Sequence, residues 1–222
     1  TDLDTLLNNV RLDYITPIFN IKDKKATDKL QSYLNSNYKV DQIDRAFVNQ
    51  IDFHSHTIKT TYEVLNTQES DPIQEMVDLC KGLYQNKNKN IGLVLNISKD
   101  FFLEVARLRA LKILIANISR DVAIDVEYNV IGKLKSEVFI DDLNNNLIHQ
   151  TTAALSAIIG GIDLLQLAQW QNTNSNYSRL SLHIQNILDL ESNIHRYQDV
   201  MGGSYFIEDL TDKIATTVWD RL

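Results

Sequence analysis

The chain has 222 residues, of which 44% are hydrophobic and 23% are charged, the balance of a soluble globular protein long enough for one large domain. Its formal net charge of −7 and the lack of a basic face argue against nucleic-acid binding, since phosphate neutralisation needs clustered lysine and arginine. A single cysteine excludes an intrachain disulfide, and neither an apolar run of about 18 residues nor a signal-like N-terminus occurs, so we expect a cytoplasmic protein without membrane contact.

Strand-like and helix-like segments alternate along nearly the whole chain, which is the pattern of parallel strands connected by covering helices. In chain order we predict a strand over 15–21, a helix over 26–35, a strand over 46–53, a helix from 71, a strand over 91–97, a helix over 99–117, a strand over 122–131, a helix over 144–159, a strand over 162–167, and helices over 177–190 and 210–222. The fold class is therefore α/β. About five strands fall short of the eight of a closed (β/α)8 barrel, so the barrel is incomplete or the sheet is open. No linker interrupts the pattern, and residues 1–222 are expected to form one domain.

Local signals mark several helix ends. Asp71 is expected to cap a helix that begins at Pro72, with Gln74 completing a capping box. Ser98 is expected to cap the longest helix. The pair Gly160-Gly161 should end another helix, because a left-handed residue there costs little when it is glycine.

The hydrophobic periodicity lapses over 57–70 and over 132–142, each time after a predicted strand. In an α/β barrel the loops after the strands build the active face. We therefore predict that these two segments are loops on that face.

Three chemically notable side chains on predicted helices have structural interpretations. Cys80 falls in the apolar periodicity of its helix and is expected to be a buried, inert thiol. Arg107 and Arg109 lie within the longest helix, where we expect pairing with carboxylates or exposure to solvent rather than substrate binding.

The segment 52–56, Asp-Phe-His-Ser-His, is the constellation that most invites a mechanism. Two histidines two positions apart on a strand point to the same face and could share a metal. A metal-dependent hydrolase of the barrel type needs further histidines at later strand ends, but His149, His183 and His195 fall in helices or in the loop after one. We expect no metal site.

Three segments carry a family resemblance. Residues 100–110, Asp-Phe-Phe-Leu-Glu-Val-Ala-Arg-Leu-Arg-Ala, are similar to a Phe-Phe-x-Glu-Ile-Ala-Lys-Leu-Arg-Ala helix, and residues 151–161 to a helix that begins Thr-Thr-x-Glu-Ala and ends Gly-Gly. Residues 186–206, with Glu191-Ser192 and Gly202 to Tyr205, are similar to a Glu-Ser…Gly-Gly-Ser-Tyr-Tyr stretch. Together, and in this order, they resemble the methylmalonyl-CoA mutase family.

The resemblance implies a fold of the (β/α)8 TIM-barrel type, here incomplete because it covers the later part of the family's substrate barrel and no cobalamin-binding domain. It implies isomerisation of methylmalonyl-CoA and succinyl-CoA, with adenosylcobalamin supplying the radical and the protein positioning that chemistry. In this family the coenzyme A thioester threads through the barrel.

Several positions depart from the family pattern. Residues 90–92 are Asn-Ile-Gly where the family has Arg-x-Ser, which removes a charge partner for the acyl-CoA. Val130 and Gly132 stand where His-x-Gln faces the corrin ring, and Ala153 replaces the glutamate of Thr-Thr-x-Glu. The family's substrate-polarising histidine falls at His54, with His56 as the competing candidate.

The retained motifs and lost site positions resemble the small, non-catalytic subunit of such a mutase. That resemblance implies a heterodimer with a homologous large catalytic subunit, an acyl-CoA reached only through the complex, and no cobalamin bound by this chain. The alternative is a self-sufficient barrel enzyme, either a mutase using a separate cobalamin-binding chain or a metal-dependent hydrolase using His54 and His56.

Overall fold

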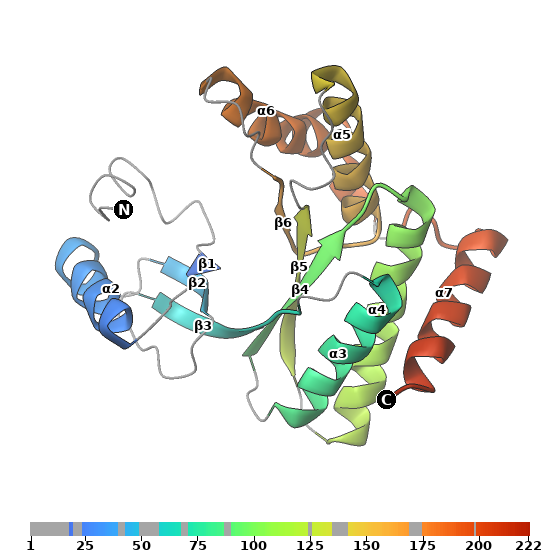
Figure 1. Ribbon diagram of the computed structural model, residues 1–222, viewed down its shortest axis with the longest axis horizontal. Helices are drawn as coiled ribbons and strands as arrows, with labels where there is room; N and C mark the ends of the chain where they lie inside the picture. The colour runs from blue at the N-terminus through green and yellow to red at the C-terminus, as the bar shows by residue number, and fades with distance from the viewer. Residues whose placement is uncertain are drawn as a thin grey trace. The chain divides into compact units, whose positions relative to one another are not determined.

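The computed structural model describes residues 18–19, 24–39, 43–48, 58–67, 71–86, 90–123, 126–134, 142–168, 175–197 and 199–222. Its elements, drawn in Figure 1, are β1 (Ile18–Phe19), α2 (Lys24–Asn37), β2 (Ile43–Val48), β3 (Ile58–Leu65), α3 (Pro72–Gln85), β4 (Asn90–Ile97), α4 (Phe101–Asp121), β5 (Glu127–Leu134), α5 (Leu143–Ile159), β6 (Leu164–Gln166), α6 (Ser175–Asn186), the π-helix η2 (Ile187–Glu191), the 3-10 helix η3 (Ile194–Arg196) and α7 (Tyr205–Trp219).

The strands form one sheet whose order follows the chain, from β1 to β6. The pairs β1 with β2, β2 with β3, and β5 with β6 are parallel. Among the described elements a helix follows every strand except β2. Sequential strands of this kind are the arrangement of a (β/α) barrel, and the described residues hold six strands rather than eight. The predicted class, an incomplete α/β fold of the TIM-barrel type, is confirmed.

The sixth strand corrects the prediction of about five strands. β3 (Ile58–Leu65) lies in the stretch 57–70, for which the lapse in periodicity predicts an active-face loop. Its sequence, Ile-Lys-Thr-Thr-Tyr-Glu-Val-Leu, sets Ile, Thr, Tyr and Val at alternate positions against Lys59 and Glu63. Alternation with a period of two residues is typical of a half-buried strand. The stretch therefore predicts a strand, although it lacks a helical periodicity.

Several element ends also differ from the prediction. β2 begins at Ile43, three residues before the predicted 46–53. β5 begins at Glu127 because Val122 still caps α4 and Ala123 has a left-handed φ of 53°. α7 begins at Tyr205, well before the predicted 210.

The helix caps are set by single side chains. The Asp71 carboxylate accepts from the backbone N–H groups of Ile73 and Gln74, as predicted, whereas the Gln74 amide donates to Asp78 instead of closing a capping box. Ser98 does not cap α4, contrary to the prediction. The cap is Asp100, whose carboxylate accepts from the N–H of Leu103, while the Ser98 hydroxyl accepts from the backbone N–H of Asp100 in the preceding turn.

The contacts divide the chain into two compact units, one comprising 1–65, 88–92 and 126–128, the other 66–87, 93–125 and 129–222. In the first unit, Phe47 of β2 and Tyr62 of β3 are register partners, with their rings stacked 4.9 Å apart. The Tyr62 hydroxyl donates to the Glu127 carboxylate, which links β3 to β5. Both aromatic rings are buried, so they form a small core of this unit.

The second unit is organised around α4, which packs against α3, α5 and α7 (Figure 1). Its buried apolar side chains lie on several sides of the helix, as expected of a helix enclosed by neighbours. They are Val105, Ala106, Leu108, Ala110, Leu111, Leu114, Ile115 and Ile118. α4 is therefore the central helix of this unit.

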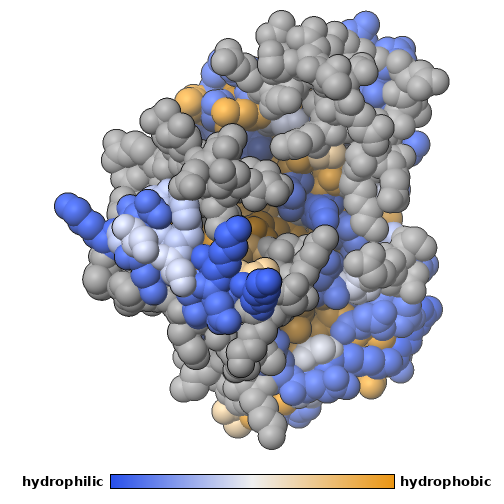
Figure 2. Space-filling view, turned by 60° about the vertical axis from the view of Figure 1, so that its left-hand side comes forward, coloured by the Kyte–Doolittle hydropathy of each residue, from blue (hydrophilic) through white to orange (hydrophobic). Residues whose placement is uncertain are grey.

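On the face in Figure 2 the coloured surface residues are largely hydrophilic, and hydrophobic residues show mainly between them. Within the part of the chain that the structure describes, no helix combines the length and apolar character needed to cross a membrane.

Candidate functional site

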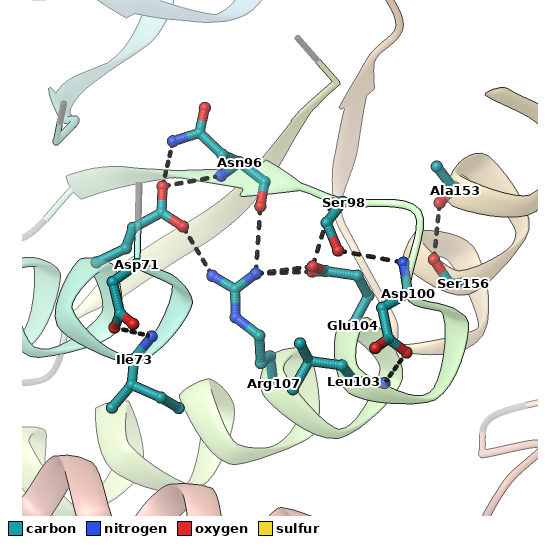
Figure 3. Close-up of polar contacts among 11 residues, drawn as sticks. Asp71, Ile73, Asn96, Ser98, Asp100, Leu103, Glu104, Arg107, Ala153 and Ser156 are labelled. Carbon is teal, nitrogen blue, oxygen red and sulfur yellow. Dashed lines mark hydrogen bonds and ion pairs between the residues drawn. The ribbon is translucent and has the colours of Figure 1, made fainter. Parts of the chain in front are cut away.

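A buried charge network joins α3, α4 and the end of β4 (Figure 3). The Arg107 guanidinium donates through Nη2 to Glu75 Oε2 at 2.7 Å and through Nη1 to Glu104 Oε1 and Oε2 at 2.8 and 2.9 Å. All three side chains are almost fully buried. The two carboxylates share the positive charge of one arginine, which reduces the cost of burying these groups.

The same network holds the backbone where β4 ends. Glu75 Oε1 accepts from the N–H of Asn96 at 3.0 Å and from its side-chain amide, and Arg107 donates to the Asn96 carbonyl at 3.3 Å. Glu104 Oε1 accepts from the N–H of Ser98 at 3.1 Å. Ligands of α/β barrels bind at the carboxyl ends of strands, so this network fixes a strand end that would border such a site.

Glu75 itself is perturbed by its environment. Burial raises the pKa of this carboxyl group above its ordinary value, and this outweighs the lowering by the Asn96 hydrogen bonds and the Arg107 charge. Its oxygens are nevertheless occupied by Asn96 and Arg107. Glu75 therefore serves as a structural contact and is not placed as a free general base.

Arg109, two residues further along α4, ties the start of α7 to that helix. Its guanidinium donates to both Asp199 oxygens and to Glu208 Oε1, the latter at 2.7 Å. Glu208 also accepts from the N–H of Gly203 at 3.1 Å, which closes the glycine turn before α7. Both arginines therefore pair with carboxylates, as predicted from their place in the helix.

The Gly160-Gly161 pair packs against the same helix at Leu108 and Lys112. A Cβ at Gly160 would lie 2.7 Å from Leu108 Cδ1, so only glycine fits without a shift. Gly161 has a φ of 80°, and its carbonyl accepts from the Lys112 ammonium. The left-handed residue that ends α5 is thus Gly161, while Gly160 gives the close approach to α4.

The three segments that carry the family resemblance therefore meet at one helix. Residues 100–110 are α4 itself, 160–161 contact Leu108 and Lys112, and 199–208 contact Arg109. Their shared feature is packing and ion pairing around α4.

The positions that the resemblance assigns to the corrin face are apolar. Val130 and Gly132 are buried on β5, and a Cβ at Gly132 would lie 3.1 Å from Ile97 Cγ1 and 3.2 Å from Ile162 Cδ1. Two isoleucines thus fill the space that a longer side chain at 132 would need. These residues provide no hydrogen-bonding side chain and do not fit a corrin-contacting surface.

Other positions that depart from the family pattern are also buried. Ile91 and Gly92 are buried in β4, and Ala153 is buried in α5, where its carbonyl accepts from the Ser156 hydroxyl at 2.9 Å. The Cys80 thiol is buried, as predicted, and burial raises its pKa to about 12.

His54 and His56 lie outside the described residues, so the catalytic and metal-binding hypotheses for them stay predictions. Among the residues that the structure describes, no three His, Cys, Asp or Glu side chains come together in a way that could hold a metal ion. The sequence-based reasoning missed Glu75, because a glutamate in the first turn of a helix is typical of helix-dipole stabilisation and carries no sign of a distant partner.

Comparison with known proteins identifies similarity over the same region. A family model described as methylmalonyl-CoA mutase matches residues 81–222.

The chain is 26% identical over 132 residues to a methylmalonyl-CoA mutase of Rhizobium meliloti (strain 1021), a match of 55% of this chain and 18% of that protein. It is 28% identical over 139 residues to a methylmalonyl-CoA mutase small subunit of Propionibacterium freudenreichii subsp. shermanii, with 58% and 22% covered. It is 27% identical over 134 residues to a protein named methylmalonyl-CoA mutase small subunit in Porphyromonas gingivalis (strain ATCC BAA-308 / W83), with 55% and 22% covered. The match thus spans 18% to 22% of the length of these relatives.

Proposed function

The chain belongs to the methylmalonyl-CoA mutase family, and we propose that it acts as a small, non-catalytic subunit of such a mutase. In the complex, a larger homologous subunit carries out the isomerisation of methylmalonyl-CoA and succinyl-CoA. That subunit holds the adenosylcobalamin, which supplies the radical chemistry when bound. This chain contributes part of a substrate-type barrel and is not active alone.

The observation that most supports this proposal is that the family's motif residues are retained while its polar site residues are lost. The motif residues pack on α4, with Arg109 paired to Glu208 and Gly160 against Leu108. The positions assigned to the corrin face are filled by Val130 and by isoleucines around Gly132. A chain that keeps its packing while losing polar site residues is what a supporting subunit requires.

The names of several relatives support the same proposal. The Propionibacterium freudenreichii and Porphyromonas gingivalis relatives are named small subunits, a term that implies a larger partner for those proteins. Similarity both to a relative named methylmalonyl-CoA mutase and to relatives named small subunits is expected if the small subunit retains the barrel of the catalytic one.

The test is reconstitution from separate chains. Purified chain is titrated with adenosylcobalamin and methylmalonyl-CoA, then mixed with a larger methylmalonyl-CoA mutase subunit from the same organism, with that subunit alone as the control. We expect no change in the corrin absorption spectrum and no turnover with the chain alone, and sedimentation as a heterodimer in the mixture. Turnover by the chain alone, or no association with the larger subunit, would overturn the proposal.

A further inference from the structure

Aromatic side chains are exposed side by side at the amino-terminal ends of α4 and α7. Phe102 is 50% exposed, Phe206 60% and Tyr205 94%. The rings of Phe102 and Phe206 meet edge to face at 5.7 Å, so the two helices share one aromatic surface. We call Phe102, Tyr205 and Phe206 the aromatic cluster. Neighbouring exposed aromatic rings of this kind are typical of surfaces that bind another protein.

The helix ends that carry the aromatic cluster are held in place by ion pairs, a hydrogen bond and ring contacts. Arg109 joins α4 to Asp199 and Glu208, and Glu208 also accepts from Gly203 two residues before Tyr205. Phe102 packs edge to face on Phe101 at 5.4 Å as well as on Phe206. A surface that is already ordered loses little conformational entropy when a partner binds.

The charges around the aromatic cluster are mainly negative. On the turns that carry it and follow it, the carboxylates with exposed or half-exposed side chains outnumber the cationic side chains. The acidic residues are Asp100, Asp199, Glu208, Asp209 and Asp212, and the cationic ones are Lys99, Arg109 and Lys213. Arg109 pairs with Asp199 and Glu208, and Lys213 pairs with Asp209, so the five carboxylates and three cations leave a net charge of −2 on this rim. In a symmetric pair of this chain the same acidic rim would face itself, and like charges across an interface disfavour the complex.

We propose that the aromatic cluster is the surface through which this chain binds the larger mutase subunit. The facing surface on that subunit is apolar, with lysine or arginine around it. The inference rests on the proposed function, since the larger subunit is the partner that function requires. The acidic rim selects a partner of opposite charge, and the rings provide the area that is removed from water.

The experiment measures affinity for the larger subunit by sedimentation, using Tyr205→Lys and Leu190→Lys. Tyr205→Lys removes a ring from the aromatic cluster and places a positive charge in its rim. Leu190→Lys makes a matched change at a residue of η2 that is 71% exposed and outside the cluster. Because both side chains are exposed, circular dichroism and the thermal midpoint should match the wild type for both variants.

We expect Tyr205→Lys to weaken the complex about tenfold or more, as for an aromatic anchor of an interface, and Leu190→Lys to leave its affinity unchanged. Equal binding by Tyr205→Lys and the wild type, or a larger loss with Leu190→Lys, would overturn the surface but leave the proposed function intact. Self-association of the wild type that is lost in Tyr205→Lys would assign the cluster to a second copy and also overturn it. No binding of the wild-type chain to the larger subunit would overturn the function itself.

Discussion

Arg107 and Glu75 are joined by an ion pair of 2.7 Å, although 32 residues separate them and their side chains are only 1% and 3% exposed. The pair connects α4 to α3, and through Asn96 it also connects both helices to the end of β4. Because the groups are removed from water, each depends on the other for its charge compensation.

Replacing Arg107 by alanine should therefore be strongly destabilising. Glu75 and Glu104 would be left buried without their shared cation, and loss of one partner of a buried pair costs about 3–5 kcal/mol. Urea unfolding followed by circular dichroism measures the free energy of unfolding. The matched control is Arg120→Ala at the exposed end of α4, where we expect a change within about 0.5 kcal/mol. Equal effects of the two substitutions would show that the buried network contributes no more than a surface arginine.

The raised pKa of Glu75 predicts a specific pH dependence of stability. Between the ordinary pKa of 4.5 and the raised one, the folded state binds more protons at this residue than the unfolded state does. Its contribution to stability is thus fully present below about pH 4.5 and is lost as pH rises through the raised pKa. The unfolding free energy of the wild type minus that of Glu75→Gln should fall as pH rises from 4.5 toward 7. A difference that grows with pH over this range would mean that the pKa of Glu75 is lowered, rather than raised, on folding.

Gly160→Ala tests the close approach of α5 to α4. The added Cβ would lie 2.7 Å from Leu108 Cδ1, and overpacking of this kind costs about 1–3 kcal/mol. In a Leu108→Ala background the obstructing atom is gone, so the same substitution should cost clearly less. Thermal or urea unfolding of the four chains gives the coupling between the two residues. Identical costs in both backgrounds would mean that Leu108 does not restrict position 160.

Gly132→Gln tests whether the apolar packing of β5 tolerates the residue that the family pattern has at this position. Ile97 and Ile162 must move to admit the glutamine side chain, so we expect a loss of about 1–3 kcal/mol in unfolding free energy and no corrin absorption change with adenosylcobalamin. Gly132→Ala adds only the Cβ and should cost less. A stable Gly132→Gln chain that binds the corrin would show that the site was lost through this residue alone.

Some of the fold follows from local sequence signals. Asp71 and Pro72 mark the start of α3 because a carboxylate can satisfy free backbone N–H groups wherever a helix begins, and this needs no distant partner. The glycine pair after α5 is also a local signal, because glycine adopts the left-handed conformation that ends a helix at little steric cost. The prediction of Ser98 as the cap of α4 is wrong, because Asp100 offers a competing cap two residues later and local sequence does not separate the two.

The α/β class, most helices and the family could all be predicted from the residues alone, since periodicity, capping and motif order are properties of neighbouring residues. The pairing of Arg107 with Glu75, that of Arg109 with Asp199, and the enclosure of Gly132 by Ile97 and Ile162 became visible only in the folded chain. These contacts join residues far apart in the chain, and charge and size alone do not tell which distant side chains will be brought together. The packing of helices on the sheet selects those partners, because burial makes an unpaired charge or an overfilled space costly.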